Sequence, residues 1–106
     1  MGIKYIISKE EFEDILQSNQ DRLTVVNFTA TWCGPCKKIA PVVETLAKAN
    51  SGVAFYKVDI NELSELSGEM KVQSVPTFIY YNDNIEVGRV VGADVDKLVN
   101  GIRQLS

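Results

Sequence analysis

Residues 23–37 read Leu-Thr-Val-Val-Asn-Phe-Thr-Ala-Thr-Trp-Cys-Gly-Pro-Cys-Lys. The first part, from Leu23 to Phe28, is rich in β-forming residues and almost entirely apolar, which is typical of a central strand buried on both faces. Asn27 stands out as the polar residue in its interior. Cys33 and Cys36 follow after a short turn, where helical spacing begins. The segment therefore predicts a buried strand that runs into a helix, with two thiols at the junction.

The length and composition of the chain limit the possible functions. With 106 residues and a mass of 11.8 kDa, residues 1–106 are expected to form a single domain. The chain has no histidine, which excludes Ser-His-Asp and Cys-His catalysis, HExxH zinc hydrolysis and the zinc deaminases. A net charge of −3 and a pI of about 4.9 argue against a nucleic-acid or anionic-membrane partner.

The sequence carries no recognisable targeting segment. Its apolar runs are only a few residues long, whereas a membrane-spanning helix needs about 20. The first residues turn acidic at Glu10 and Glu11 and lack the apolar core of a secretory signal. We therefore expect a cytoplasmic protein.

Apolar periodicity alternates between strand and helix on both sides of the opening segment. Ser8 and Glu11 form a capping-box pattern that opens the first helix, and Asn61 is expected to cap a short one. The order predicted is β-α-β-α-β-α-β-β-α, which favours an α/β fold with a mixed central sheet and helices on both faces. We expect strands over 3–7, 23–28, 53–58, 77–81 and 85–91, and helices from Ser8, over 35–49 and 61–70, and around 95–102.

The two thiols are placed for redox chemistry. Two residues separate Cys33 from Cys36, so a disulfide between them closes locally. Cys33 lies at or before the first helical turn, where unpaired N–H groups and the helix dipole stabilise a thiolate and make it the attacking sulfur. Cys36 lies one turn further, where it can attack a mixed disulfide. Pro35 suits the first helical turn and stiffens the loop between the thiols.

Two other interpretations of the cysteine pair are structural cysteines and a zinc site. Inert structural cysteines are poorly suited to an exposed turn between a strand and a helix. Structural zinc usually takes four Cys or His ligands, and this chain offers two cysteines and no histidine, so carboxylates or a second chain would have to complete the site. Redox chemistry is the interpretation favoured, and no metal site is expected.

Five parts of the chain together resemble the thioredoxin family, in particular its eukaryotic cytosolic type. A bare Cys-X-X-Cys is a weak signal, but Trp-Cys-Gly-Pro-Cys-Lys, then Val-Pro-Thr-Phe, then a late glycine in this order is a strong one. The order of elements agrees over about residues 3–105. The matching parts are residues 28–37, Pro41, Lys57–Asp59, Val75–Phe78 and Gly92.

The resemblance implies a thioredoxin fold, with a central mixed five-stranded sheet flanked by four helices. It implies that Cys33 is the nucleophile and Cys36 the resolving thiol, and that a cis peptide bond precedes Pro76. The backbone of Val75 would pair with an extended substrate segment. The residues that would shape the groove around the thiols are Trp32, Gly34, Pro35, Val75, Pro76, Gly92 and Ala93.

The activity implied is that of a thiol-disulfide oxidoreductase that reduces protein disulfides. No bound cofactor is implied beyond the redox-active disulfide Cys33–Cys36, and NADPH would act indirectly through a thioredoxin reductase. Other implied partners are disulfide-containing proteins such as peroxiredoxins, methionine sulfoxide reductase or ribonucleotide reductase. The protein is expected to act as a monomer.

Asn27 departs from the family, which usually has a buried aspartate at that place. The resemblance assigns that carboxylate a role in moving protons to and from the resolving thiol, and an amide cannot exchange protons in this way. Lys57 would neighbour the altered position. We therefore expect a more stable fold but a slower reaction of Cys36 than in an Asn27→Asp counterpart.

Two further functions remain open from the sequence. The first is a redox-sensing interaction module that binds a partner in one oxidation state and turns over little, an interpretation that Asn27 favours. The second is a net disulfide oxidant or isomerase, against which the Gly34-Pro35 loop and the absence of an export signal both argue. The reduction potential relative to that of the compartment decides the direction.

Overall fold

The computed structural model describes residues 2–106, and its nine elements confirm the predicted order. Five strands form one sheet in the order β1-β3-β2-β4-β5, with β1 and β2 parallel to β3, and β4 antiparallel to both β2 and β5. The sheet is therefore mixed, as predicted. The strands are β1 (Lys4–Tyr5), β2 (Thr24–Thr29), β3 (Ala54–Asp59), β4 (Thr77–Asn82) and β5 (Ile85–Val91).

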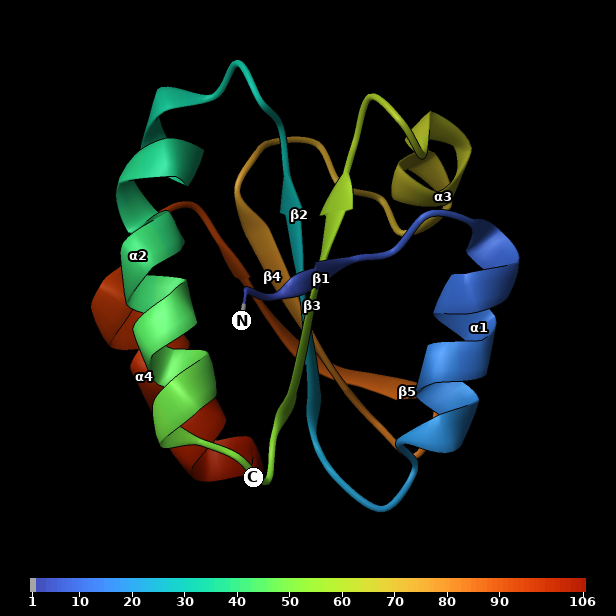
Figure 1. The fold of residues 1–106 in the computed structure, drawn as a ribbon, viewed down its shortest axis with the longest axis vertical. Coiled ribbons are helices and arrows are strands. Elements are labelled where there is room, and N and C mark those ends of the chain that lie inside the picture. Colours follow the sequence, from blue (N-terminus) through green and yellow to red (C-terminus); the bar gives the residue numbers. More distant parts are fainter. Residues whose placement is uncertain (1) are drawn as a thin grey trace.

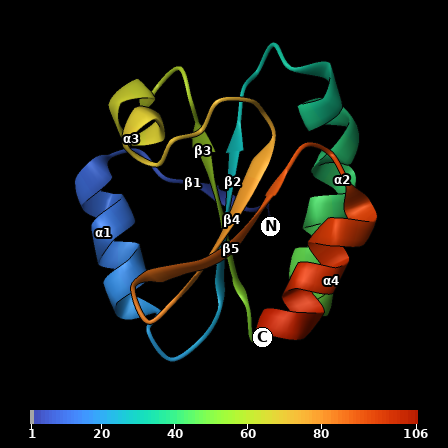
Figure 2. The same ribbon diagram turned by 180° about the vertical axis from the view of Figure 1, so that it is seen from behind.

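Helices cover both faces of the sheet, which makes three layers (Figure 1). Helices α1 and α3 lie on one face, and α2 and α4 lie on the other, as the view from behind also shows (Figure 2). This arrangement confirms the α/β class with a five-stranded sheet and four helices. The helices are α1 (Lys9–Ser18), α2 (Gly34–Ala49), α3 (Ser64–Glu69) and α4 (Val95–Leu105).

The alternation of side chains along β2 divides the core in two. Val26 and Phe28 face α1 and α3, in a cluster with Phe12 of α1 and Leu66 of α3. Val25 faces the other side and belongs to a cluster with residues of α2 and α4. Because successive residues of a strand point to opposite faces, Asn27 shares the face of Val25 and lies beneath α2.

Local signals account for most of the boundaries. The Ser8 side chain accepts a hydrogen bond from the Glu11 N–H at 3.0 Å and caps α1, as predicted. The β4–β5 hairpin turns on Asp83 and Asn84, both with positive φ, which is the backbone geometry that two-residue hairpin loops favour.

Most boundaries lie within a residue or a few of the sequence prediction, and the starts of β1 and α3 differ in ways that have a physical reason. The first strand is limited to Lys4–Tyr5 rather than residues 3–7, because only these two residues pair with β3. Helix α3 begins at Ser64, and Leu63 precedes it without a side-chain cap. Asn61 is therefore not the cap that the sequence predicted, because its side chain is engaged elsewhere.

Candidate active site

Cys33 and Cys36 form a disulfide at the start of α2, with their Cα atoms 5.3 Å apart. Cys33 is the N-cap of the helix, and its sulfur accepts a hydrogen bond from the Cys36 N–H at 3.2 Å. Pro35 lies within the first turn, as predicted. The Cys33 sulfur thus lies where backbone N–H groups and the helix dipole favour a negative charge.

The two sulfur-bearing residues are both largely buried, but they line different hollows. Cys33 is 5% exposed and Cys36 is 3% exposed. Cys33 lines a groove of about 420 Å³ on one side of the disulfide, whereas Cys36 lines a cavity of about 250 Å³ on the other. A molecule in the groove therefore meets Cys33, and Cys36 is reached from behind.

The groove beside Cys33 contains several of the residues predicted to shape it. Trp32, at 66% exposed, forms part of its open rim. The Val75 carbonyl oxygen lies 3.7 Å from Cys33 Sγ. The predicted residues that line this groove are Trp32, Gly34, Pro35 and Val75.

The remaining predicted residues lie nearby but outside this groove. Ala93 lines a second hollow, of about 530 Å³, on the other side of Pro35. The Pro76 side chain is fully buried, and the Val75–Pro76 peptide bond is cis. The Gly92 N–H donates to the Pro76 carbonyl oxygen at 2.8 Å. Gly92 has φ of +99°, a conformation that favours glycine.

A residue that the sequence reasoning missed orients the exposed indole. Trp32 Nε1 donates a hydrogen bond to Asn61 Oδ1 at 2.8 Å. Asn61 is fixed in turn because its N–H donates to Asp59 Oδ1, also at 2.8 Å. An asparagine directly after a strand-end aspartate is a turn signal, but nothing in the sequence pairs it with a tryptophan that lies so far away along the chain.

Asn27 and Lys57 lie behind the disulfide, on neighbouring strands. They are register partners across the parallel β2–β3 pair. Asn27 is 7% exposed, and its Oδ1 atom has no hydrogen-bond partner among residues 2–106. Lys57 Nζ lies 4.4 Å from the centre of the Tyr5 ring, a cation–π contact. Tyr5 is therefore the partner of Lys57, which the sequence did not indicate.

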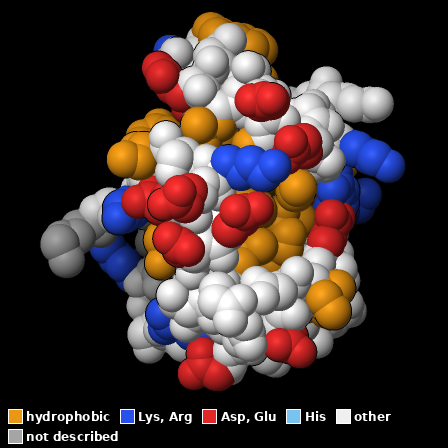
Figure 3. All heavy atoms as spheres, turned by 90° about the vertical axis from the view of Figure 1, so that its right-hand side faces the viewer, with side chains coloured by type: hydrophobic (Ala, Val, Ile, Leu, Met, Phe, Trp, Pro, Cys, Tyr) orange, Lys and Arg blue, Asp and Glu red, His pale blue; other side chains and the backbone are white. Residues whose placement is uncertain are grey.

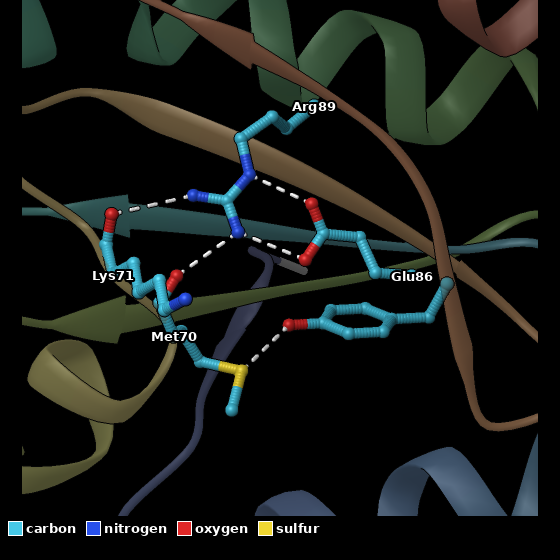
Figure 4. A network of polar contacts seen from close by, with 5 residues as sticks. Met70, Lys71, Glu86 and Arg89 are labelled. Carbon is cyan, nitrogen blue, oxygen red and sulfur yellow. Dashed lines mark hydrogen bonds and ion pairs between the residues drawn. The ribbon is translucent and has the colours of Figure 1, made fainter.

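A polar network holds the segment that leads into the groove (Figure 4). Arg89 donates to the carbonyl oxygens of Met70 at 2.9 Å and Lys71 at 3.4 Å, where α3 ends. The same guanidinium donates two hydrogen bonds to Glu86, at 2.7 and 2.8 Å. This pair lowers the pKa of Glu86. Because residues 72–75 line the groove and follow Met70 and Lys71 in the chain, Arg89 anchors the segment that leads into the groove wall.

The chain is similar to known proteins over most of its length. Residues 4–104 match the thioredoxin family. The chain belongs to the thioredoxin family. It is 39% identical to human thioredoxin over 103 residues, covering 97% of this chain and 98% of that protein. It is 49% identical to thioredoxin-2 of Saccharomyces cerevisiae over 87 residues, covering 82% and 83%.

The structural comparison agrees with the sequence comparison. The crystal structure of Fasciola hepatica thioredoxin matches with a TM-score of 0.96 and 38% sequence identity, covering 98% of this chain and 100% of that one. The five-stranded mixed sheet with four helices is thus the thioredoxin fold. With a redox-active disulfide at the start of α2, the chain is a thiol-disulfide oxidoreductase of the thioredoxin type, with protein-disulfide reductase activity.

Residues 2–106 contain neither a candidate metal site nor a candidate membrane span. No group of three or more Cys, Asp or Glu side chains there is placed to hold a metal ion. None of the described helices has the length and apolar character needed to cross a membrane.

Proposed function

We propose that Cys33 attacks a disulfide of a protein substrate and that Cys36 then resolves the mixed disulfide. The observation that carries this assignment is that the two cysteines line different hollows. Cys33 lines the groove that is open to a partner, and its sulfur already accepts the Cys36 N–H. Cys36 lines the cavity behind the disulfide.

The reaction follows as two thiol-disulfide exchanges. The Cys33 thiolate attacks one sulfur of the substrate disulfide, forms the mixed disulfide and releases the other sulfur as a thiolate. Cys36 loses its proton and attacks Cys33 Sγ, so that the Cys33–Cys36 disulfide forms and the second substrate sulfur leaves. The substrate gains two electrons and the protein loses them.

The surroundings of Cys33 suit an extended peptide segment. Trp32, Gly34 and Pro35 would supply one wall of the groove, and Val75 the other, where its backbone would pair with the substrate in the manner of strand addition. Pro76 and Gly92 would hold Val75 in place through their backbone hydrogen bond. Ala93 would extend the contact surface past Pro35.

The proposed partners follow from family membership. A thioredoxin reductase drawing on NADPH would regenerate the dithiol, and the substrates would be disulfide-containing proteins such as peroxiredoxins, methionine sulfoxide reductase or ribonucleotide reductase. We propose that the protein acts in the cytoplasm as a monomeric electron carrier. Residues 1–106 would form its single domain. Asn27 and Lys57 would form an altered version of the site that moves protons to and from Cys36, with an amide where the family usually has a carboxylate.

The surface charge supports partners that are neither nucleic acid nor membrane. Acidic side chains gather on the face covered by α1 and α3 (Figure 3). Helix α1 alone carries Glu10, Glu11, Glu13 and Asp14. A phosphate backbone or an anionic lipid surface would be repelled by such a face.

Insulin reduction with NADPH and a thioredoxin reductase tests the proposed roles. The wild-type protein should turn over many times. Cys33→Ser should abolish both turnover and covalent capture of substrate. Cys36→Ser should abolish turnover while accumulating a mixed disulfide through Cys33, which a non-reducing gel and mass spectrometry detect. Capture by Cys33→Ser instead of Cys36→Ser would reverse the assignment.

The same assay separates the enzyme from a redox-sensing module. A module would bind its partner stoichiometrically without repeated turnover of insulin. The reduction potential then separates a reductase from a net oxidant or isomerase. A value well above that of the cytosolic glutathione pool would overturn the reductase assignment.

A further inference from the structure

Met70 fastens the end of α3 through both its backbone and its side chain (Figure 4). Its N–H donates to the Leu66 carbonyl oxygen at 2.9 Å, and its carbonyl oxygen accepts a hydrogen bond from Arg89 at 2.9 Å. Its thioether sulfur accepts a hydrogen bond from the Tyr81 hydroxyl at 3.3 Å. One residue therefore ties the end of α3 to both β4 and β5.

The chain turns sharply after Met70 and then enters the groove. Lys71 has φ of +58°, a left-handed conformation that is unfavourable for a residue other than glycine. Such a conformation persists where the surrounding structure holds it. Residues 72–75 follow at once and line the groove beside Cys33. The contacts of Met70 thus hold the chain immediately before the groove wall.

The Met70 side chain also packs with residues of the groove itself. Met70, Ile60 and Val72 are partly buried and pack against the same core cluster. Ile60 and Val72 both line the groove. Because protein interiors are closely packed, a change in the size or position of one side chain is felt by its neighbours. A chemical change at the Met70 sulfur would therefore reach the apolar lining of the groove.

The sulfur of Met70 is the reactive atom of this arrangement. Met70 is partly exposed, so a small oxidant can reach it from solvent, and a thioether is oxidised reversibly to a polar sulfoxide. Tyr81 is 5% exposed, and its hydroxyl uses the sulfur as its acceptor. Burial raises the pKa of Tyr81, so this hydroxyl stays a donor at neutral pH. Since a buried donor without an acceptor is unfavourable, the hydroxyl would donate to the sulfoxide oxygen after oxidation.

We propose that Met70 is a site of reversible oxidation by peroxides, with the Tyr81 hydroxyl as the donor that holds the sulfoxide oxygen. A lone pair of the Met70 sulfur attacks one peroxide oxygen, the O–O bond breaks and a sulfur–oxygen bond forms. The departing oxygen takes the proton of the transferred oxygen and leaves as water or an alcohol. The sulfur loses two electrons and the peroxide gains them.

The position of the new oxygen determines the effect on the groove. For the Tyr81 hydroxyl to donate to the sulfoxide oxygen, the sulfur must move away from the hydroxyl, because the oxygen then lies between them. That movement changes the packing that Met70 shares with Ile60 and Val72. We expect oxidised protein to bind substrate less tightly, an effect that rests on the proposed role of the groove.

Peroxide treatment of the disulfide form tests the site, because Cys33 and Cys36 are then protected. Peptide mass spectrometry should find one added oxygen on the peptide that contains Met70, and methionine sulfoxide reductases of both stereochemical classes should remove it. Because exposure governs susceptibility, oxidation by hydrogen peroxide should reach at least about a tenth of the rate in urea-unfolded protein. If Met70 remains unmodified in the folded protein while the unfolded protein is oxidised there, the proposal is overturned.

Insulin reduction after removal of the peroxide measures the effect on the groove. KM of the oxidised protein should be about two- to fivefold higher than before treatment, the size expected for one altered contact, and should return after sulfoxide reduction. Met70→Leu keeps an apolar side chain of similar volume and lacks the sulfur, so its KM should be the same before and after peroxide. An equal rise in Met70→Leu, or an unchanged KM in fully oxidised wild-type protein, would refute the effect.

Tyr81→Phe tests the role of the hydroxyl while keeping the ring. Without this donor, oxidation of Met70 should lower the urea midpoint more than it does in the wild-type protein. Tyr56→Phe alters another partly buried tyrosine that packs against the same cluster and should respond as the wild type does. Equal changes in the two variants would overturn the assignment of Tyr81 as the donor. If Met70 is not oxidised while untreated protein still reduces insulin, only this site fails and the proposed function stands.

Discussion

Asn27 of β2 and Lys57 of β3 are register partners in the parallel part of the sheet, and both line the cavity that Cys36 shares. Because parallel partners point to the same face of a sheet, the amide and the ammonium group lie on the side covered by α2. The interior of the sheet thus presents a neutral acceptor and a cation, without a carboxylate, behind the resolving thiol.

Replacing this amide with a carboxylate should trade stability for rate. We expect Asn27→Asp to lower the free energy of unfolding at neutral pH by about 1–3 kcal/mol, because burying a charge costs several kcal/mol and Lys57 offsets only part of that cost. The resolving reaction of Cys36 should accelerate about tenfold or more, because the carboxylate can accept the thiol proton.

Urea unfolding and single-turnover reduction of a disulfide substrate measure the two effects of Asn27→Asp. An Asn27→Leu variant serves as the control, since it removes the amide without adding a base and should not accelerate the reaction. A higher urea midpoint for the aspartate form, or equal rates of the wild-type and aspartate proteins across the pH range, would contradict these expectations.

The hydrogen bond from Trp32 to Asn61 should matter for substrate binding more than for stability. Asn61→Ala removes an exposed acceptor, so the free energy of unfolding should fall by less than about 1 kcal/mol. We expect KM for insulin to rise about two- to threefold with kcat little changed, because the indole at the groove rim loses its fixed orientation.

Asn61→Asp is the matched variant, because it keeps the Oδ1 acceptor for Trp32 Nε1. It should restore the KM of the wild-type protein. A change confined to kcat in Asn61→Ala, or equal KM values in both variants, would show that the hydrogen bond does not position the indole.

Arg89 should stabilise the groove wall through its hydrogen bonds where α3 ends. Arg89→Leu leaves the Met70 and Lys71 carbonyl oxygens without this donor. We expect the free energy of unfolding to fall by about 1 kcal/mol. This value is at the low end for charged hydrogen bonds because the site is partly exposed. We also expect KM for insulin to rise. Arg103→Leu, at an exposed position of α4, should leave KM unchanged.

The Arg89–Glu86 pair also predicts a pH dependence. Because Arg89 lowers the pKa of Glu86, the pair contributes stability that is present above the pKa of an unfolded glutamate. That contribution is lost as the pH falls through the folded-state pKa of Glu86. The difference in urea midpoint between the wild-type protein and Arg89→Leu should therefore narrow in acid. A difference that widens in acid would show that Glu86 is not involved.

Two glycines in helices should respond oppositely to the same substitution. A Cβ at Gly101 would lie 2.6 Å from Tyr80 Cζ, and that ring is fixed because its hydroxyl donates to the Leu98 carbonyl oxygen at 2.8 Å. Gly101→Ala should therefore cost about 1–3 kcal/mol. A Cβ at Gly68 meets nothing within 4 Å, so Gly68→Ala should stabilise the protein by about 0.5–1 kcal/mol. Urea midpoints of the two variants that move in the same direction would contradict this contrast.

The order of the elements and the reactive cysteine pair could be predicted from the sequence. The largely apolar character of residues 23–28 indicated a strand covered on both faces, and this strand is the central one of the sheet. The position of Cys33 and Cys36 at the start of a helix followed from the apolar spacing after them. Such features are readable because each depends on neighbours within a few residues of the chain.

The contacts between residues that are distant in the sequence depend on the three-dimensional arrangement of the elements. Asn61 is a cap by sequence pattern, but the fold brings Trp32 within hydrogen-bond distance of its side chain, and the helix starts later. Arg89 reads as a strand residue, yet it holds the end of α3. Asn27 was singled out by sequence, but its unpartnered oxygen and the cations around Cys36 arise from packing β2 and β3 against α2. Such contacts depend on strand register and helix placement, which local patterns do not encode.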